Sequence, residues 1–125
     1  MISIFKKQNT VYMVAQHKLD VKDYENLIPI LTDHIKTHQE VAWYIEMKDF
    51  EGWTASAYWK GIELELPNEE RLSRVALVGS VKWQEHYTEA LMPFSKAHIK
   101  FFKPEEKDNA KKWIDNSFED EKTTN

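Results

Sequence analysis

The sequence predicts an α/β fold, with a mainly parallel sheet of four or five strands and helices packed mostly on one face. Short apolar runs rich in β-branched residues end at turn signals, as Arg74–Val78 ends at Gly79. Residues at helical spacing follow these runs, and the alternation recurs along the chain. Parallel strands joined in this way need right-handed crossovers. If every crossover advances in one direction, the helices crowd one face, and the less covered face favours a homodimer.

Size and composition indicate one domain, residues 1–125, with a polar tail from Glu119 that we expect to fray. With 42% hydrophobic residues, a chain of 125 residues can bury a single core. A formal net charge of -4 and a pI of ≈ 5.7 argue against nucleic acid as a partner, because neutralising phosphates needs a surplus of lysine and arginine.

The compartment is predicted from what the sequence lacks. The absence of cysteine excludes disulfides, thiolate nucleophiles and zinc–thiolate sites, and it fits the cytoplasm. Residues Met1–Lys7 lack the apolar segment of a signal peptide, and no run of about 18 apolar residues is present to span a bilayer. We therefore expect a cytoplasmic protein, with peripheral attachment to a membrane left open.

The N-terminal third predicts two strands and a helix. Met1–Phe5 forms an edge strand before a turn at Lys6–Asn9, and the apolar run Thr10–Ala15 forms the second strand. Asp20 opens a helix, with Asp23 as its capping partner. The apolar stripe of this helix consists of Tyr24, Leu27, Ile28, Leu31 and Ile35. Pro29 lies within it and predicts a kink or a handover between two short helices.

The middle of the chain predicts a strand at Val41–Ile45, a turn at Asp49–Gly52 and a helix from Gly52 to Ile62. The helical residues that would face the sheet are Ala55, Tyr58, Trp59 and Ile62. Trp53 falls on the opposite side, so it has no obvious place in the core. An exposed tryptophan forgoes much of the stabilisation that burial would give, which makes Trp53 a candidate for ligand contact.

The last third predicts two more strand–helix units. After Arg74–Val78, Ser80 is placed as the N-cap of a helix that Pro93 ends. The apolar face of that helix carries Trp83, Tyr87 and Leu91. Ile99–Phe102 forms the final strand, and Pro104 occupies the first position of a helix. The buried stripe of that helix consists of Ala110, Trp113 and Ile114.

Several blocks of the sequence resemble the SpoIIAA-like family of small bacterial STAS-type proteins. The blocks are Asp23-Tyr24-Glu25 with Pro29, Asp49–Trp53, Arg74–Gly79 with Lys82-Trp83, Ile99–Phe102 and Ala110–Ile114, covering roughly residues 10–115. The resemblance implies a STAS-like fold of four β–α turns, related in shape to CRAL-TRIO lipid-binding domains. It also implies a role that involves apolar ligands or membrane surfaces. Family members often carry a glycine before the first helix, where this chain has His17-Lys18-Leu19.

The candidate ligand-binding residues are Phe50, Trp53, Ser80, Lys82 and Trp83. They follow predicted strands, and ligands of parallel α/β sheets bind outside the carboxyl ends of strands. Ser80 is first of all a helix cap, but the free amides beside it, together with Lys82, suit an anionic headgroup or a carboxylate. Burial of Trp53 by its own loop is the alternative to ligand contact.

Other chemistry receives less support. STAS anti-anti-sigma proteins resemble one another in a phosphorylatable serine at a helix start, and the nearby hydroxyls here are Thr54 and Ser56, in surroundings that do not match that motif. His34 and His38 have a spacing that can hold a metal, but without a third ligand we expect solvent-facing imidazoles and no metal. No hydrolase motif or phosphate-binding glycine-rich loop is present, so we expect neither an enzyme nor a cofactor.

The sequence thus predicts a non-enzymatic STAS-like binding module for an apolar or amphipathic small molecule, such as a lipid, or for a membrane surface. The alternative is a regulatory protein–protein interaction module resembling anti-anti-sigma factors. Phe50 and Trp53 are the residues on which liposome binding would depend.

Overall fold

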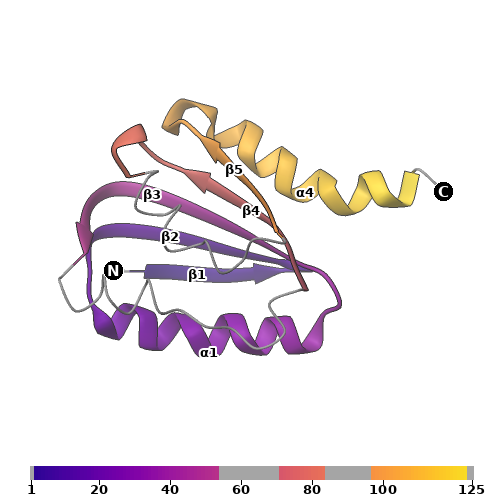
Figure 1. The fold of residues 1–125 in the computed structure, drawn as a ribbon, viewed down its shortest axis with the longest axis horizontal. Helices are drawn as coiled ribbons and strands as arrows, with labels where there is room; N and C mark the ends of the chain where they lie inside the picture. The colour runs from indigo at the N-terminus through magenta and orange to yellow at the C-terminus, as the bar shows by residue number, and fades with distance from the viewer. Residues whose placement is uncertain (1, 54–70, 84–96, 124–125) are drawn as a thin grey trace.

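A five-stranded sheet organises the computed structural model, which describes residues 2–53, 71–83 and 97–123 (Figure 1). The strands lie in chain order: β1 (Ile2–Lys7), β2 (Thr10–Leu19), β3 (Val41–Trp53), β4 (Leu72–Val78) and β5 (His98–Phe102). β1 is antiparallel to β2, and the remaining neighbours are parallel. The predicted mainly parallel sheet with an N-terminal edge strand is confirmed.

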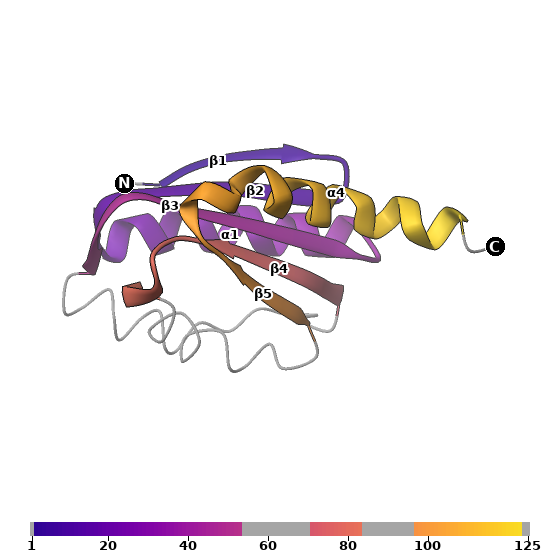
Figure 2. The ribbon, with the colours of Figure 1, turned by 90° about the horizontal axis from the view of Figure 1, so that it is seen from above.

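The two helices that the structure describes lie on opposite faces of the sheet. α1 (Val21–Thr37) connects β2 to β3, and α4 (Lys107–Thr123) follows β5 after a short 3₁₀ turn, η3 (Pro104–Glu106). Figure 1 shows α1 below the strands and α4 above them, and Figure 2 shows α4 in front with α1 behind. Neither of these helices is long and apolar enough to cross a membrane.

The prediction of helices mostly on one face concerned four helices, and only α1 and α4 are among the described residues. Strand order shows that successive parallel strands do advance in one direction. α4 follows the last strand and belongs to no crossover, so the crossover rule does not restrict it to the face of α1. α4 extends to Thr123, and fraying of the tail from Glu119 stays a prediction. The helices expected after Trp53 and after Trp83 fall outside the described residues.

The two faces have different cores. The face under α1 is mainly aliphatic, and its buried residues include Val11, Leu27, Leu31, Ile35, Val41, Ile45 and Leu77. The face under α4 is richer in aromatic residues, with Tyr12, Tyr44 and Phe102 beside Ala110 and Ile114 of the helix. Successive residues of a strand point to opposite faces, which is why Tyr12 and Val11 belong to different cores.

The start of α1 follows the predicted capping. The Asp20 carboxylate accepts from the amide of Asp23 at 3.1 Å, and the Asp23 carboxylate accepts from the amide of Asp20 at 2.9 Å. α1 continues as one helix through Pro29, so a handover between two helices does not occur. Leu27, Leu31 and Ile35 form the buried stripe as predicted.

The carboxyl ends of β2 and β3 depart from regular pairing. His17 pairs with Phe50 and Lys18 pairs with Gly52, so β3 carries extra residues at Asp49 and Glu51. The φ angles of His17, Asp49 and Gly52 are 58°, 51° and 103°. The predicted turn at Asp49–Gly52 is therefore wrong. Asp49 and Gly52 adopt left-handed backbone within a bulged strand, and the pairing of that strand with β2 continues.

Candidate functional site

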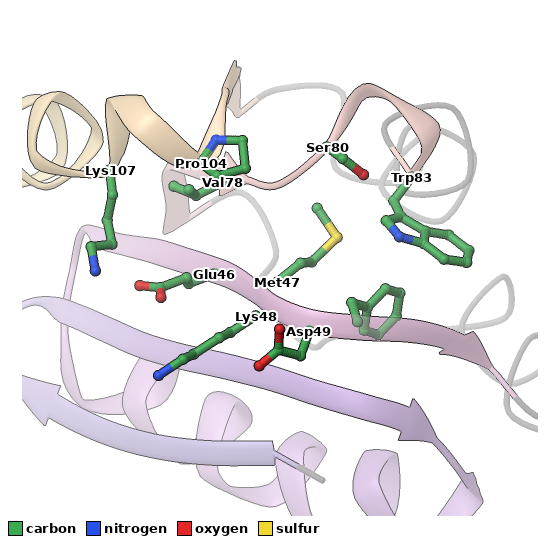
Figure 3. A pocket seen from close by; sticks show the side chains of 10 residues that line it. Glu46, Met47, Lys48, Asp49, Val78, Ser80, Trp83, Pro104 and Lys107 are labelled. Carbon is green, nitrogen blue, oxygen red and sulfur yellow. The ribbon is translucent and has the colours of Figure 1, made fainter.

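A pocket of ≈ 430 Å³ opens where β3 and β4 end (Figure 3). Its apolar lining consists of Met47, Phe50, Val78, Trp83 and Pro104, and its polar lining of Glu46, Lys48, Asp49, Ser80 and Lys107. Small-molecule pockets commonly measure about 300–1,000 Å³. The carboxyl ends of parallel strands are the usual place for ligands of α/β sheets.

Strand pairing brings these residues together from distant parts of the chain. Glu46 of β3 pairs with Val78 of β4, so these two lining residues lie side by side on neighbouring strands. The amide of Gly79 donates to the carbonyl of Phe102 at 3.0 Å and so fixes the exit of β4 against β5. The chain that leaves β5 then supplies Pro104 and Lys107.

Gly79 and Met47 pack tightly beside the pocket. A Cβ at Gly79 would lie 2.2 Å from Cε and 3.2 Å from Cβ of Met47. The absence of a side chain at this position therefore lets the Met47 thioether occupy the space between β3 and the turn after β4. In Figure 3, Met47 projects into the middle of the pocket.

One end of the pocket is aromatic. The rings of Phe50 and Trp83 meet edge to face, with centroids 5.0 Å apart and an interplanar angle of 81°. A Cβ at Gly52 would lie 3.0 Å from Cη2 of Trp83, so the bare backbone of the bulge packs against the indole. Nζ of Lys82 lies 4.9 Å from the centroid of the Trp83 ring, within cation–π range.

The other end of the pocket is charged. Figure 3 shows Glu46 and Lys107 together at the end opposite Trp83. The buried Tyr44 hydroxyl donates to Oε1 of Glu46 at 2.9 Å. Burial, followed by this hydrogen bond, raises the pKa of Tyr44 above its ordinary value, so its hydroxyl keeps its proton and stays a donor. The hydrogen bond from the buried Tyr44 hydroxyl thus fixes the position of the Glu46 carboxylate.

Comparison with known proteins identifies the family. The SpoIIAA-like family model matches residues 10–115. The chain belongs to the SpoIIAA-like family. An uncharacterised protein from Shewanella loihica PV-4 with a SpoIIAA-like fold is similar in structure, with a TM-score of 0.65 and 28% sequence identity. The match covers 91% of this chain and 92% of that protein. No curated protein matches the chain. Family membership supports a STAS-type module, and the absence of enzymatic activity stays a prediction.

The structure brings together three of the five predicted site residues of this SpoIIAA-like chain. Phe50, Ser80 and Trp83 line the pocket, and Lys82 lies beside it on the Trp83 ring. The backbone of Trp53 pairs with Leu19 as the last residue of β3, so its predicted place in a helix is wrong. The side chain of Trp53 lies outside the described residues, as do Thr54 and Ser56. The ligand-binding role of all five residues stays a prediction.

Sequence reasoning missed the charged residues of the pocket. Glu46, Lys48 and Asp49 belong to the second half of β3, which we had expected to end at Ile45. The signal was available, because Glu46 and Lys48 continue the alternation that places Tyr44 on the face of α4. Lys107 was overlooked because nothing in the sequence shows that the start of α4 approaches β3.

The histidine pair of α1 differs from the expectation of two solvent-facing imidazoles. His34 is only 4% exposed, and its buried Nε2 has no hydrogen-bond partner among the residues that the structure describes. The ring of His38 stacks on it with centroids 4.1 Å apart, and His38 is half-buried. Burial, helped by the neighbouring His38, lowers the pKa of His34. Among the described residues, no group of three metal-ligating side chains is present.

Proposed function

We propose that this SpoIIAA-like chain is a binding module whose pocket takes a small amphipathic molecule. The observation that carries the proposal is the polarity of the pocket along its length. Phe50 and Trp83 form an apolar end, and Glu46 and Lys107 form a charged end. Apolar walls with a few placed polar groups are typical of small-molecule sites.

The aromatic pair would hold the apolar part of the ligand. Aromatic side chains provide large contact areas, and an edge-to-face pair is itself favourable by about 0.5–1.5 kcal/mol. Gly52 and Phe50 constrain the Trp83 ring from two sides, so the aromatic end is formed before a ligand arrives. Preorganisation of this kind reduces the entropic cost of binding.

A ligand search on the purified protein tests the proposal. Native mass spectrometry would detect small molecules that co-purify, and calorimetric titration would measure binding of octanoate, octylamine and phenylalanine. We expect at least one of these amphipaths to bind. The proposal is overturned if nothing co-purifies and none of them binds.

A matched pair of phenylalanine substitutions locates the binding. Phe50→Ala removes part of the aromatic end, whereas Phe5→Ala removes a side chain that is 58% exposed and lies on β1, outside the pocket. We expect Phe50→Ala to weaken binding about tenfold and Phe5→Ala to leave it unchanged. Equal effects of the two changes would place the ligand elsewhere.

A regulatory protein-interaction module is the second candidate, favoured by Val81. This apolar residue is 68% exposed and lies between Ser80 and Lys82 beside the pocket. Under this alternative, Val81→Asp abolishes capture of a partner protein but leaves the binding of amphipaths unchanged. Loss of both would instead indicate that the substitution disturbs the pocket.

A further inference from the structure

The charged groups of the pocket balance one another. Glu46 and Asp49 contribute two carboxylates, and Lys48 and Lys107 contribute two ammonium groups. These residues come from β3 and from the start of α4, on either side of the same opening. A ligand headgroup therefore meets both signs of charge at once.

Glu46 is the best positioned of the four groups. It is half-buried, and its Oε1 accepts from the hydroxyl of Tyr44, a residue that is only 1% exposed. A carboxylate held by a buried donor loses little freedom when it binds a ligand. Lys107 lies at the same end of the pocket, and its exposed side chain is able to adapt to the ligand.

A headgroup with a single charge would suit this end poorly. An ammonium that approaches Glu46 comes near Lys107, and a carboxylate that approaches Lys107 comes near Glu46. Like charges brought together at an interface oppose binding, and this is how charged sites discriminate between ligands. A headgroup that carries both charges satisfies both residues.

We infer that the ligand of this pocket is a zwitterion with an apolar body, of the kind represented by an apolar amino acid. Its ammonium group is bound by Glu46, its anionic group by Lys107, and its apolar body extends over Met47 to Phe50 and Trp83. This inference rests on the proposed function, because it specifies the headgroup of the amphipath that the pocket takes.

Three probes with one apolar body test the inference. Phenylalanine carries both charges, phenethylamine carries only the ammonium, and 3-phenylpropionate carries only the carboxylate. Calorimetric titration of the unmodified protein at pH 7 gives the three dissociation constants. We expect phenylalanine to bind about tenfold more tightly than either analogue, because each analogue forfeits a hydrogen bond to a charged group.

Charge-removing substitutions assign the two ends of the headgroup. Glu46→Gln is expected to reduce the preference for phenylalanine over 3-phenylpropionate, and Lys107→Gln the preference for phenylalanine over phenethylamine. Glu105→Gln and Lys112→Gln change exposed residues outside the pocket and are expected to leave both preferences intact.

A pair of tyrosine substitutions tests the positioning of Glu46. Tyr44→Phe removes the hydroxyl that holds Glu46, whereas Tyr12→Phe removes a buried hydroxyl that donates to Asp115. Both changes delete one hydrogen bond on the same face of the sheet. We expect only Tyr44→Phe to reduce the preference for phenylalanine over 3-phenylpropionate.

The outcomes separate the inference from the proposed function. If either analogue binds as tightly as phenylalanine, or if only octanoate or octylamine binds, the inference of a zwitterionic ligand is overturned. The proposal that the pocket binds an amphipath is then still supported. If no amphipath binds and none co-purifies, the proposed function fails and the inference fails with it.

Discussion

The two ends of the parallel strands are built in different ways. At the amino ends, Asn9 Nδ2 donates to the carbonyl of Glu40 at 2.9 Å, and Ser73 Oγ donates to the carbonyl of Val41 at 3.2 Å. At the carboxyl ends, β2 and β3 are bulged, and the pocket opens beside them. The amino ends of the parallel strands are therefore closed by packing and hydrogen bonds. At the carboxyl ends, the pairing of β2 with β3 is irregular, and the space beside it is accessible.

Truncation of one buried side chain at each end tests this contrast most strongly. Leu72 begins β4 and is 1% exposed, whereas Met47 is buried but lines the pocket. We expect Leu72→Ala to reduce the free energy of unfolding by about 3 kcal/mol, because it leaves a closed cavity. Met47→Ala is expected to cost at most about 2 kcal/mol, since the space that it leaves joins the pocket.

Urea unfolding of the two variants provides the measurement. An equal or greater loss for Met47→Ala would show that the carboxyl ends are packed as tightly as the amino ends, which contradicts the contrast.

A methyl group at Gly52 directly tests the bulged carboxyl ends of β2 and β3. The φ of 103° disfavours any residue with a Cβ, and that Cβ would lie 3.0 Å from the Trp83 ring. We expect Gly52→Ala to lower the free energy of unfolding by about 1–2 kcal/mol and to alter the tryptophan emission.

A double-mutant cycle separates the two causes of this loss. In a Trp83→Leu background the backbone strain remains, but the contact with the indole is removed. A smaller cost of Gly52→Ala in that background would measure the contact. An unchanged cost would show that the backbone angle alone is responsible.

The regular part of the molecule could be predicted from the sequence because its signals are local. Apolar runs such as Thr10–Ala15 and Arg74–Val78 specify buried strands, and the Asp20 and Asp23 pair specifies the start of α1. The family resemblance depended on the order of such blocks, and the family match over residues 10–115 bears it out.

The bulged end could not be predicted in the same way. Asp49 and Gly52 favour left-handed backbone both in a turn and in a β-bulge, and only pairing with β2 decides between them. The pocket had the same difficulty, because Glu46 and Lys107 are far apart in the chain and meet through tertiary packing. Phe50 and Trp83 were found because aromatic residues after strands already suggested a ligand site.

The loss of stability at low pH that His34 causes tests the amino ends of the parallel strands, where this histidine is buried. Its ring is buried near the amino ends of the strands, and burial is the main cause that lowers its pKa below the ordinary value of 6.5. The charges of His38 and Lys6 also lower this pKa, whereas a hydrogen bond with the backbone of Asn9 and the charge of Asp33 raise it. The unfolded chain therefore binds a proton more readily than the folded chain does. This contribution to stability is complete above pH 6.5 and is lost as the pH falls through the folded pKa.

Urea unfolding at pH 7.5 and pH 5 measures the effect. We expect His34→Gln to show a smaller loss of stability on acidification than the unmodified protein. His98→Gln changes an exposed imidazole on β5 and is expected to retain the full loss. The same pH dependence in both variants would exclude His34 as its source.

The smallest expected effect lies at His17, within the bulged pairing of β2 and β3. Its φ of 58° is a conformation that glycine adopts without strain. His17→Gly relieves about 1 kcal/mol of strain, which the flexibility of glycine in the unfolded chain offsets in part. The His17 imidazole also lies 3.8 Å from the Glu51 carboxylate, a contact between exposed groups that contributes little to stability.

His17→Ala removes that contact but keeps the strain, so His17→Gly should be the more stable variant, by about 0.5 kcal/mol or more. If the two variants are equally stable, the left-handed backbone at His17 carries no strain, and the bulge opens the carboxyl end of the sheet at no cost to folding.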